Sequence, residues 1–68
     1  MADRSEVVNY TPNGREIRRE TRGGKEVYAV QSPRDNWWAT GRTIRAAMLS
    51  AGWSRRLVDR DYAGAEDM

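Results

Sequence analysis

The side chains able to take part in proton transfer are carboxylates, tyrosines, arginines and one lysine, because the sequence contains neither histidine nor cysteine. Ser-His-Asp and Cys-His nucleophilic arrangements therefore cannot form. Imidazole and thiolate metal ligands are missing as well, so we expect no structural zinc and no disulfide. The phosphate-binding patterns GxxxxGKS/T and GxGxxG do not occur. We predict a protein that is not an enzyme and that uses no cofactor, metal or small-molecule substrate.

The carboxylates offer the one remaining route to acid–base chemistry. Asp59 and Asp61 flank Arg60, and Glu66 precedes Asp67 near the end of the chain. A pair of acids needs a pocket that sets their protonation states apart. The sequence gives no sign of such a pocket here, and we expect these groups to be solvated surface charges.

The positive charge is unevenly distributed along the chain. All twelve basic residues precede position 61, and eleven of them are arginine. The only charged residues among the last eight are acidic: Asp61, Glu66 and Asp67. A basic body attracts polyanions such as nucleic acid. A GC-rich genome also favours arginine over lysine, so the arginine bias is either functional or compositional.

Two features concern the location of the protein. No segment approaches the roughly 18 apolar residues that a transmembrane helix needs. The first residues are charged and lack the apolar stretch of a signal peptide. Together with the absence of cysteine, this leads us to expect a cytoplasmic protein without a membrane partner.

Three segments have the composition of β-strands: residues 6–11, 15–22 and 25–31. Pro12-Asn13-Gly14 separates the first two and is a strong turn signal. Gly23-Gly24 separates the second and third and suits a two-residue primed turn. These signals predict an antiparallel sheet.

The register of the second hairpin has two possibilities. A two-residue loop pairs Ile17 with Val30, and it places Arg22 opposite Lys25, where like charges destabilise. A three-residue loop aligns Ile17 with Ala29 instead. A slip of one residue exchanges the faces of one strand relative to the other. We favour the two-residue loop.

A short aromatic segment, Trp37-Trp38-Ala39, follows a loop over residues 32–36. Adjacent residues of an extended chain point to opposite sides. We therefore expect one tryptophan to enter the core and the other to face outward or cover an edge. The outward tryptophan either serves packing or anchors a partner, since tryptophan is enriched at binding hot spots.

Residues 41–51 carry a helical pattern, with apolar residues at helical spacing: Ile44, Ala47, Met48 and Ala51. Thr40 is the expected N-cap. Gly52 suits the left-handed position after the helix, which brings Trp53 onto Met48. The opposite side of the helix carries Arg42, Arg45 and Leu49. Leu49 either packs under the C-terminal segment or contacts a partner.

The last part of the chain is predicted to hold a short helix and a tail. Ser54 is a candidate cap for a helix whose Leu57 and Val58 fold back on the domain. The complete expectation is an α+β fold: a three-stranded antiparallel sheet with one helix on one face and a short C-terminal helix or tail. Residues 1–60 form the domain and residues 61–68 an acidic flexible tail.

One functional hypothesis places nucleic acid on the sheet face that the helix leaves open. A two-stranded ribbon fits a major groove, and arginine binds guanine or phosphate. Glu16 and Glu20 interrupt this basic surface and repel phosphate. The candidate nucleic-acid-binding residues are Arg15, Arg18, Arg22, Lys25 and Arg34.

The favoured hypothesis is a small accessory or inhibitor protein, of the kind that phages and mobile elements encode, that binds a protein partner or a second copy of itself. Mixed charge with arginine and tryptophan suits a protein interface. The candidate partner-binding residues are Trp37, Trp38, Arg42, Arg45 and Leu49.

Overall fold

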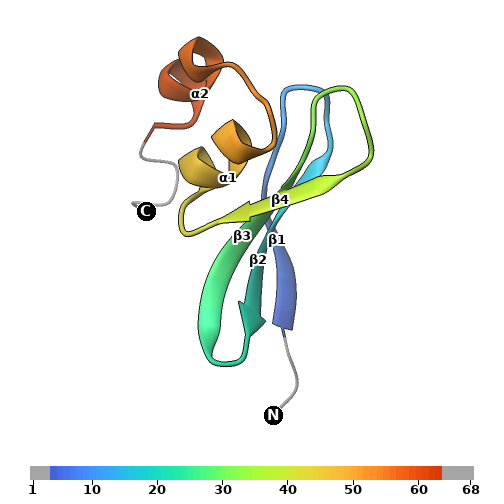
Figure 1. Cartoon of the computed structure of the whole chain (residues 1–68), viewed down its shortest axis with the longest axis vertical. Helices are drawn as coiled ribbons and strands as arrows, with labels where there is room; N and C mark the ends of the chain where they lie inside the picture. The colour runs from blue at the N-terminus through green and yellow to red at the C-terminus, as the bar shows by residue number, and fades with distance from the viewer. Residues whose placement is uncertain (1–3, 64–68) are drawn as a thin grey trace.

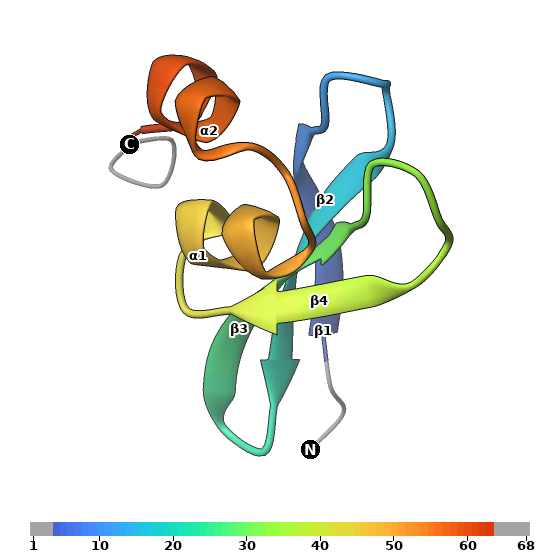
Figure 2. The same cartoon turned by 45° about the horizontal axis from the view of Figure 1, so that its top comes forward.

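A four-stranded sheet followed by two helices makes up the fold in the computed structural model, which describes residues 4–63 (Figure 1). The sheet is antiparallel with its strands in sequence order: β1 (Arg4–Tyr10), β2 (Glu16–Arg22), β3 (Lys25–Gln31) and β4 (Trp38–Gly41). Both helices lie on the same side of the sheet (Figure 2): α1 (Ile44–Ser50) and α2 (Arg55–Asp61). The predicted α+β class is confirmed, and the sheet has one strand more than the three expected.

The hairpin between β2 and β3 has the predicted two-residue turn. Gly23 and Gly24 have φ values of 55° and 81°, and a type I′ turn needs positive φ at both positions. Arg22 consequently pairs with Lys25. In this register Ile17 and Val30 point into the core, where both are 0% exposed.

The connection from β1 to β2 is the turn expected at Pro12-Asn13-Gly14. The amide of Gly14 donates to the carbonyl of Thr11 over 2.9 Å, and the amide of Thr11 donates to the carbonyl of Arg15 over 2.8 Å. Further along β1 the register shifts between Val7 and Asn9. A bulge of this kind twists an edge strand and protects it from pairing with another chain.

The strand missing from the sequence prediction is β4, which has only four residues. It pairs with β3, from Gln31 opposite Trp38 to Tyr28 opposite Gly41. At Gly41 the next helix comes very close: a Cβ atom there would lie 2.6 Å from the amide nitrogen of Ala47. Glycine at this position allows α1 to rest directly on the sheet.

Helix α1 buries the predicted apolar stripe. Ile44 is 2% exposed, and Ala47, Met48 and Ala51 are 0% exposed. The helix begins later than predicted, because Thr40 belongs to β4 and therefore cannot cap it. The prediction of Thr40 as the N-cap is wrong: the hydroxyl of Thr43 accepts from the amide of Ala46 over 3.0 Å, so Thr43 is the cap.

The end of α1 follows the prediction. Gly52 has a φ of 99°, and its amide donates to the carbonyl of Leu49 over 3.2 Å. The amide of Trp53 donates to the carbonyl of Met48 over 3.1 Å. These are the two hydrogen bonds of a Schellman motif. The turn directs the chain back toward the sheet, and Trp53 packs against the core.

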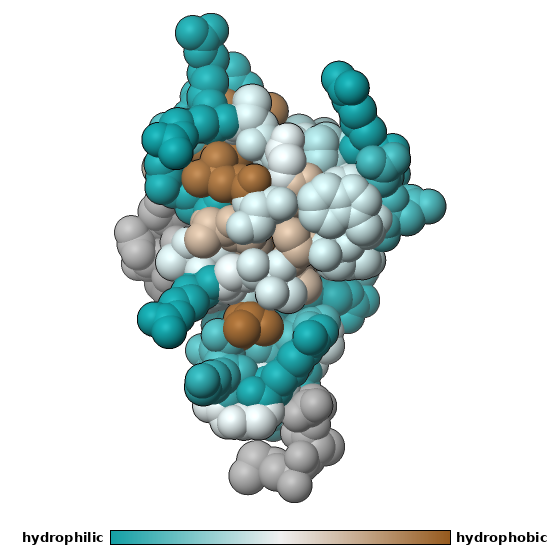
Figure 3. All heavy atoms as spheres, viewed as in Figure 1, coloured by the Kyte–Doolittle hydropathy of each residue, from teal (hydrophilic) through white to brown (hydrophobic). Residues whose placement is uncertain are grey.

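The core is one layer between the sheet and the helices. Its largest fully buried side chains are Ile17, Met48, Val30 and Val58. All buried side-chain nitrogen and oxygen atoms of the described residues have a hydrogen-bond partner. On the surface shown in Figure 3, strongly hydrophobic side chains appear only as small separate patches. The buried aliphatic side chains of β2, β3 and the two helices thus form that single layer.

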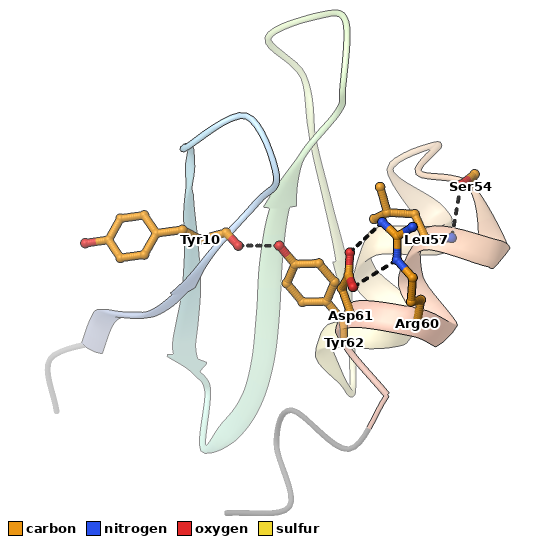
Figure 4. Close-up of polar contacts among 6 residues, drawn as sticks. All are labelled: Tyr10, Ser54, Leu57, Arg60, Asp61 and Tyr62. Atoms are coloured by element: carbon orange, nitrogen blue, oxygen red, sulfur yellow. Dashed lines mark hydrogen bonds and ion pairs between the residues drawn. The ribbon is translucent and has the colours of Figure 1, made fainter.

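Helix α2 closes the core from the C-terminal side. Ser54 caps it as predicted, accepting from the amide of Leu57 over 3.3 Å. The hydroxyl of Tyr62 donates to the carbonyl of Tyr10 over 2.5 Å, which ties the end of the helix to β1 (Figure 4). The predicted tail 61–68 therefore begins inside the fold, because Asp61 ends α2 and Tyr62 is 7% exposed. Residues 64–68 lie outside the described part of the chain.

The ionisation of Tyr62 makes this attachment sensitive to pH. Burial raises the pKa of Tyr62 above its ordinary value of 10.0, and the neighbouring charge of Asp61 acts in the same direction. Folding therefore favours the neutral phenol. The contribution of Tyr62 to stability is constant well below pH 10, and it falls as the pH rises from there through the raised pKa of the folded state, because the unfolded chain releases the proton first.

We expect Tyr62→Phe to lower the free energy of unfolding by about 1 kcal/mol, because one hydrogen bond is lost. The variant should also lose less stability than the wild type above pH 10, since it has no phenol to ionise at this position. Urea unfolding at neutral and alkaline pH measures both effects. Equal stability of the two proteins would show that Tyr62 lies outside the packed fold.

We expect Gly41→Ala to destabilise the protein by about 1–3 kcal/mol, the usual cost of forcing an extra carbon into a packed contact. The nearest atoms are backbone atoms of α1, which cannot rotate away. Thermal unfolding measures the change. Thr40→Ala, on the opposite side of the same strand, is the matched control and should have a much smaller effect. An unchanged melting temperature for Gly41→Ala would contradict the close contact.

Candidate functional site

The side of the sheet away from the helices is not covered by any element of residues 4–63. We call this surface the open face. Strand pairing places the following residues on it: Val7, Tyr10, Glu16, Arg18, Glu20, Arg22, Lys25, Val27, Ala29, Trp38 and Thr40. The ring of Tyr10 points away from Tyr62 and the helices (Figure 4).

Large apolar side chains are exposed on the open face. Val7 is 37% exposed, Trp38 is 45% exposed and Tyr10 is 55% exposed. Trp38 borders a shallow hollow of about 310 Å³, which is otherwise lined by Arg18, Glu20, Arg22, Ala29 and Thr40. Exposed aromatic rings beside arginine are typical of surfaces that bind other molecules.

The arginines of the open face are paired with acids of the same strand. A nitrogen of Arg18 lies 2.6 Å from a carboxylate oxygen of Glu16, and Arg22 is paired in the same way with Glu20. Exposed pairs of this kind add little stability. They do cancel much of the positive charge, so the open face is a surface of alternating sign.

The predicted nucleic-acid residues do not form one surface. Arg18, Arg22 and Lys25 lie on the open face. Arg15 instead donates to the loop before β4, over 2.8 Å to the carbonyl of Asp35 and 3.3 Å to that of Ser32. Arg34 belongs to that same loop, at the end of the molecule away from the β2–β3 turn (Figure 1).

The predicted partner-binding residues are also separated. Arg45 of α1 is paired with Asp59 of α2 over 2.8 Å, and Leu49 packs against the core. Packing beneath the C-terminal segment was one of the two roles expected for Leu49. Arg42 is exposed between β4 and α1.

The expectation that one of the two adjacent tryptophans enters the core is wrong. Trp37 is 49% exposed and Trp38 is 45% exposed. The space beneath the helices is filled by smaller aliphatic side chains together with Tyr62 and part of Trp53. The two indoles still point to opposite sides of the sheet, Trp38 to the open face and Trp37 toward the end of α1.

Strands β1 and β2 also carry an ion pair on the helix side of the sheet. Arg19 of β2 is hydrogen-bonded to the carboxylate of Glu6 on β1. This hydrogen bond is the main reason that the pKa of Arg19 lies above its ordinary value, and the charge of Glu6 adds to the effect. Arg19 is therefore also paired, and a ligand could contact it only by displacing the carboxylate of Glu6.

A second hollow lies where the β3–β4 loop faces the turn between the helices. We call it the loop groove. It measures about 490 Å³, and its walls include Pro33, Arg34, Trp37, Gly52, Trp53 and Ser54. The indole N–H of Trp53 donates to the carbonyl of Gln31 over 2.9 Å, which fixes that ring in place. The hydroxyl of Ser32 accepts from the amide of Asp35 over 2.8 Å and shapes the loop.

Sequence reasoning did not find the loop groove. Trp37 and Trp53 come from different elements, and only the packing of the α1 end beside β4 brings them to one hollow. Two residues of the groove had been noticed in the sequence. Trp53 was predicted to pack on Met48, and Arg34 was predicted to belong to the open face.

Among residues 4–63, no three acidic side chains lie close enough to hold a metal ion together, and no helix there is long and apolar enough to cross a membrane. No protein-family model matches the chain, and comparisons with curated proteins and with solved structures find no match. The accessory or inhibitor role in a phage or mobile element stays a prediction.

The contacts of Arg15 indicate a structural role. We expect Arg15→Ala to lower the free energy of unfolding by about 1 kcal/mol, because the carbonyls of Ser32 and Asp35 lose a charged donor. Lys25→Ala removes an exposed cation of the β2–β3 hairpin that has no ion pair among the described residues, and it serves as the control. Urea unfolding of both variants measures the difference. Equal stability would mean that Arg15 does not hold the loop.

Proposed function

We propose that this chain is a non-enzymatic binding protein that docks a protein surface on its open face, and that the partner is a second copy of the chain. The observation that carries the proposal is the exposure of Val7, Tyr10 and Trp38 on a sheet face of alternating charge. Burying such apolar area is the main driving force of protein association.

The charge pattern favours a protein partner over nucleic acid on this face. Glu16 and Glu20 lie between the arginines and pair with them. A phosphate approaching Arg18 or Arg22 would displace a carboxylate and then remain beside it. A protein surface supplies charges of both signs and an apolar centre, which matches the composition of the open face.

The order of charges along β2 points to a second copy. Every second residue of the strand faces outward, which gives the series Glu16, Arg18, Glu20, Arg22. A half-turn about an axis in the interface, perpendicular to β2 and passing at Arg19, lays two copies of the strand antiparallel. Glu16 then faces Arg22 of the second copy, and Arg18 faces its Glu20. The series is thus complementary to itself.

The same rotation also matches the neighbouring strand. Val27 pairs with Glu20 and Ala29 with Arg18 within the sheet. The half-turn therefore brings Val27 of one copy over Ala29 of the other, and apolar contacts adjoin the row of charges. Closed two-fold pairs are the commonest oligomers, and a domain this small buries a lower fraction of its surface on folding than larger domains do. Face-to-face packing of sheets is a common way to cover such a surface.

Sedimentation equilibrium over a wide range of protein concentrations tests the proposal. We expect a monomer–dimer equilibrium that Arg18→Glu weakens by about tenfold or more, because position 18 then faces Glu20 of the second copy as a like charge. Adding Glu20→Arg to that variant should restore association, since the exchanged charges are again opposite across the two-fold axis.

The controls separate this interface from a general effect of charge. Trp37 directly precedes β4 and lies at the other hollow, so Trp37→Ala should leave association unchanged, whereas Trp38→Ala should weaken it. Thermal unfolding of each variant shows whether the fold is retained. A wild-type protein that is monomeric at every concentration would overturn the proposal, and so would a double variant that stays as weak as Arg18→Glu alone.

A further inference from the structure

The loop groove is a second surface, distinct from the open face. It lies on the helix side of β4, and its frame is fixed before any ligand arrives. Arg15 holds the carbonyls of the β3–β4 loop, the Schellman turn holds Gly52, and Gln31 holds the indole of Trp53. A fixed frame loses little conformational freedom when a ligand binds.

Two indole rings line this groove. Trp37 is 49% exposed and is not required for the core. Trp53 packs on the core with part of its surface, and its anchored ring also contributes to the wall of the groove. Flat aromatic rings accessible to solvent are platforms on which nucleobases stack, and stacking is possible for every base.

The arginines around the loop groove differ from the arginines of the open face in being unpaired among the described residues. Arg34 lines the groove, and Arg55 and Arg56 directly follow Ser54 of its wall. None of these three arginines forms an ion pair with another residue in the range 4–63, whereas Arg18, Arg19 and Arg22 of β2 all do. Asp35 is the acid in the groove wall. The balance of charge there is positive.

We propose that the loop groove binds a single-stranded nucleic-acid segment. Bases stack on Trp37 and against Trp53, and phosphates contact Arg34 and the arginines at the start of α2. Unpaired cations combined with exposed aromatic rings are the features that such binding uses. A duplex keeps its base faces stacked inside the helix and cannot present them to Trp37. An acidic peptide would engage the arginines and leave the indoles without stacking partners.

Fluorescence anisotropy with a labelled oligothymidylate of about ten nucleotides tests the site, since single-strand sites are of this length. We expect binding that weakens as salt increases. Trp37→Ala should reduce the affinity by about tenfold or more through lost stacking. Arg34→Gln should reduce it as well and make the slope of log affinity against log salt shallower by about 0.7, the value for one phosphate contact to a single strand.

Trp38→Ala is the matched control, because the same type of side chain is removed from the adjacent residue, which points to the other side of the sheet. It should leave oligonucleotide binding unchanged even where it weakens self-association, so this proposal and that of the open face fail independently. Trp53 is kept intact because its ring is part of the packing. Duplex DNA of equal length and poly-glutamate serve as competitors.

Three outcomes would overturn the proposal. One is no binding of the oligonucleotide at low salt. Another is equal competition by poly-glutamate, which would assign the groove to acidic proteins. The third is equal loss of affinity in Trp37→Ala and Trp38→Ala, which would show that stacking in the loop groove is not the source of the affinity.

Discussion

The contact of α1 with β4 is the constraint on which the rest of the structure depends. Gly41 has no side chain, and the backbone of α1 at Ala47 occupies the space where a Cβ atom would lie. This close approach lets the short stripe from Ile44 to Ala51 reach Ile17 and Val30 on the sheet. A chain of 68 residues has enough apolar side chains for one such layer. Both helices are used on one side, and the other side of the sheet is left to solvent or to a partner.

Where local geometry decides the structure, the sequence was sufficient to predict it. Gly23-Gly24 fixes a primed turn, and that turn fixes the pairing of β2 with β3. The spacing from Ile44 to Ala51 defines the buried side of α1, and Gly52 defines its end. In each of these cases a few neighbouring residues determine the backbone, so no information from distant parts of the chain is needed.

Where distant segments decide, the sequence was insufficient. The four residues of β4 become a strand because β3 offers them a free edge, and this strand takes Thr40 away from the helix. Both Trp37 and Trp38 remain outside because aliphatic residues of β2, β3 and the helices already fill the core. The predicted C-terminal boundary of the domain, residue 60, lies too early in the chain. Tyr62 belongs to the fold because it is hydrogen-bonded to Tyr10, a residue far away in the sequence.

The candidate site shows the same division. Arginines at alternating positions of β2 were correctly placed on one face, since a strand has a period of two. Their pairing with Glu16 and Glu20 follows from the same alternation and was visible in the sequence as well. The positions of Arg15 and Arg34 could not be predicted from the sequence, because they depend on how the β1–β2 turn packs against the β3–β4 loop.

Two groups of arginines can be distinguished in this protein, those that form ion pairs on β2 and those at the loop groove, which have none within the described part of the chain. On β2 an acid at every alternate outward position neutralises the arginines, whereas at the loop groove the arginines lie in turns and at a helix start, without such an alternation. The loop groove therefore differs from the outward side of β2 in that its arginines form no ion pair among residues 4–63. Trp37 and Trp38 connect the two surfaces, because adjacent residues at the start of an extended segment must point to opposite sides. The two proposed sites therefore use different indoles, and a ligand on Trp37 would leave Trp38 exposed.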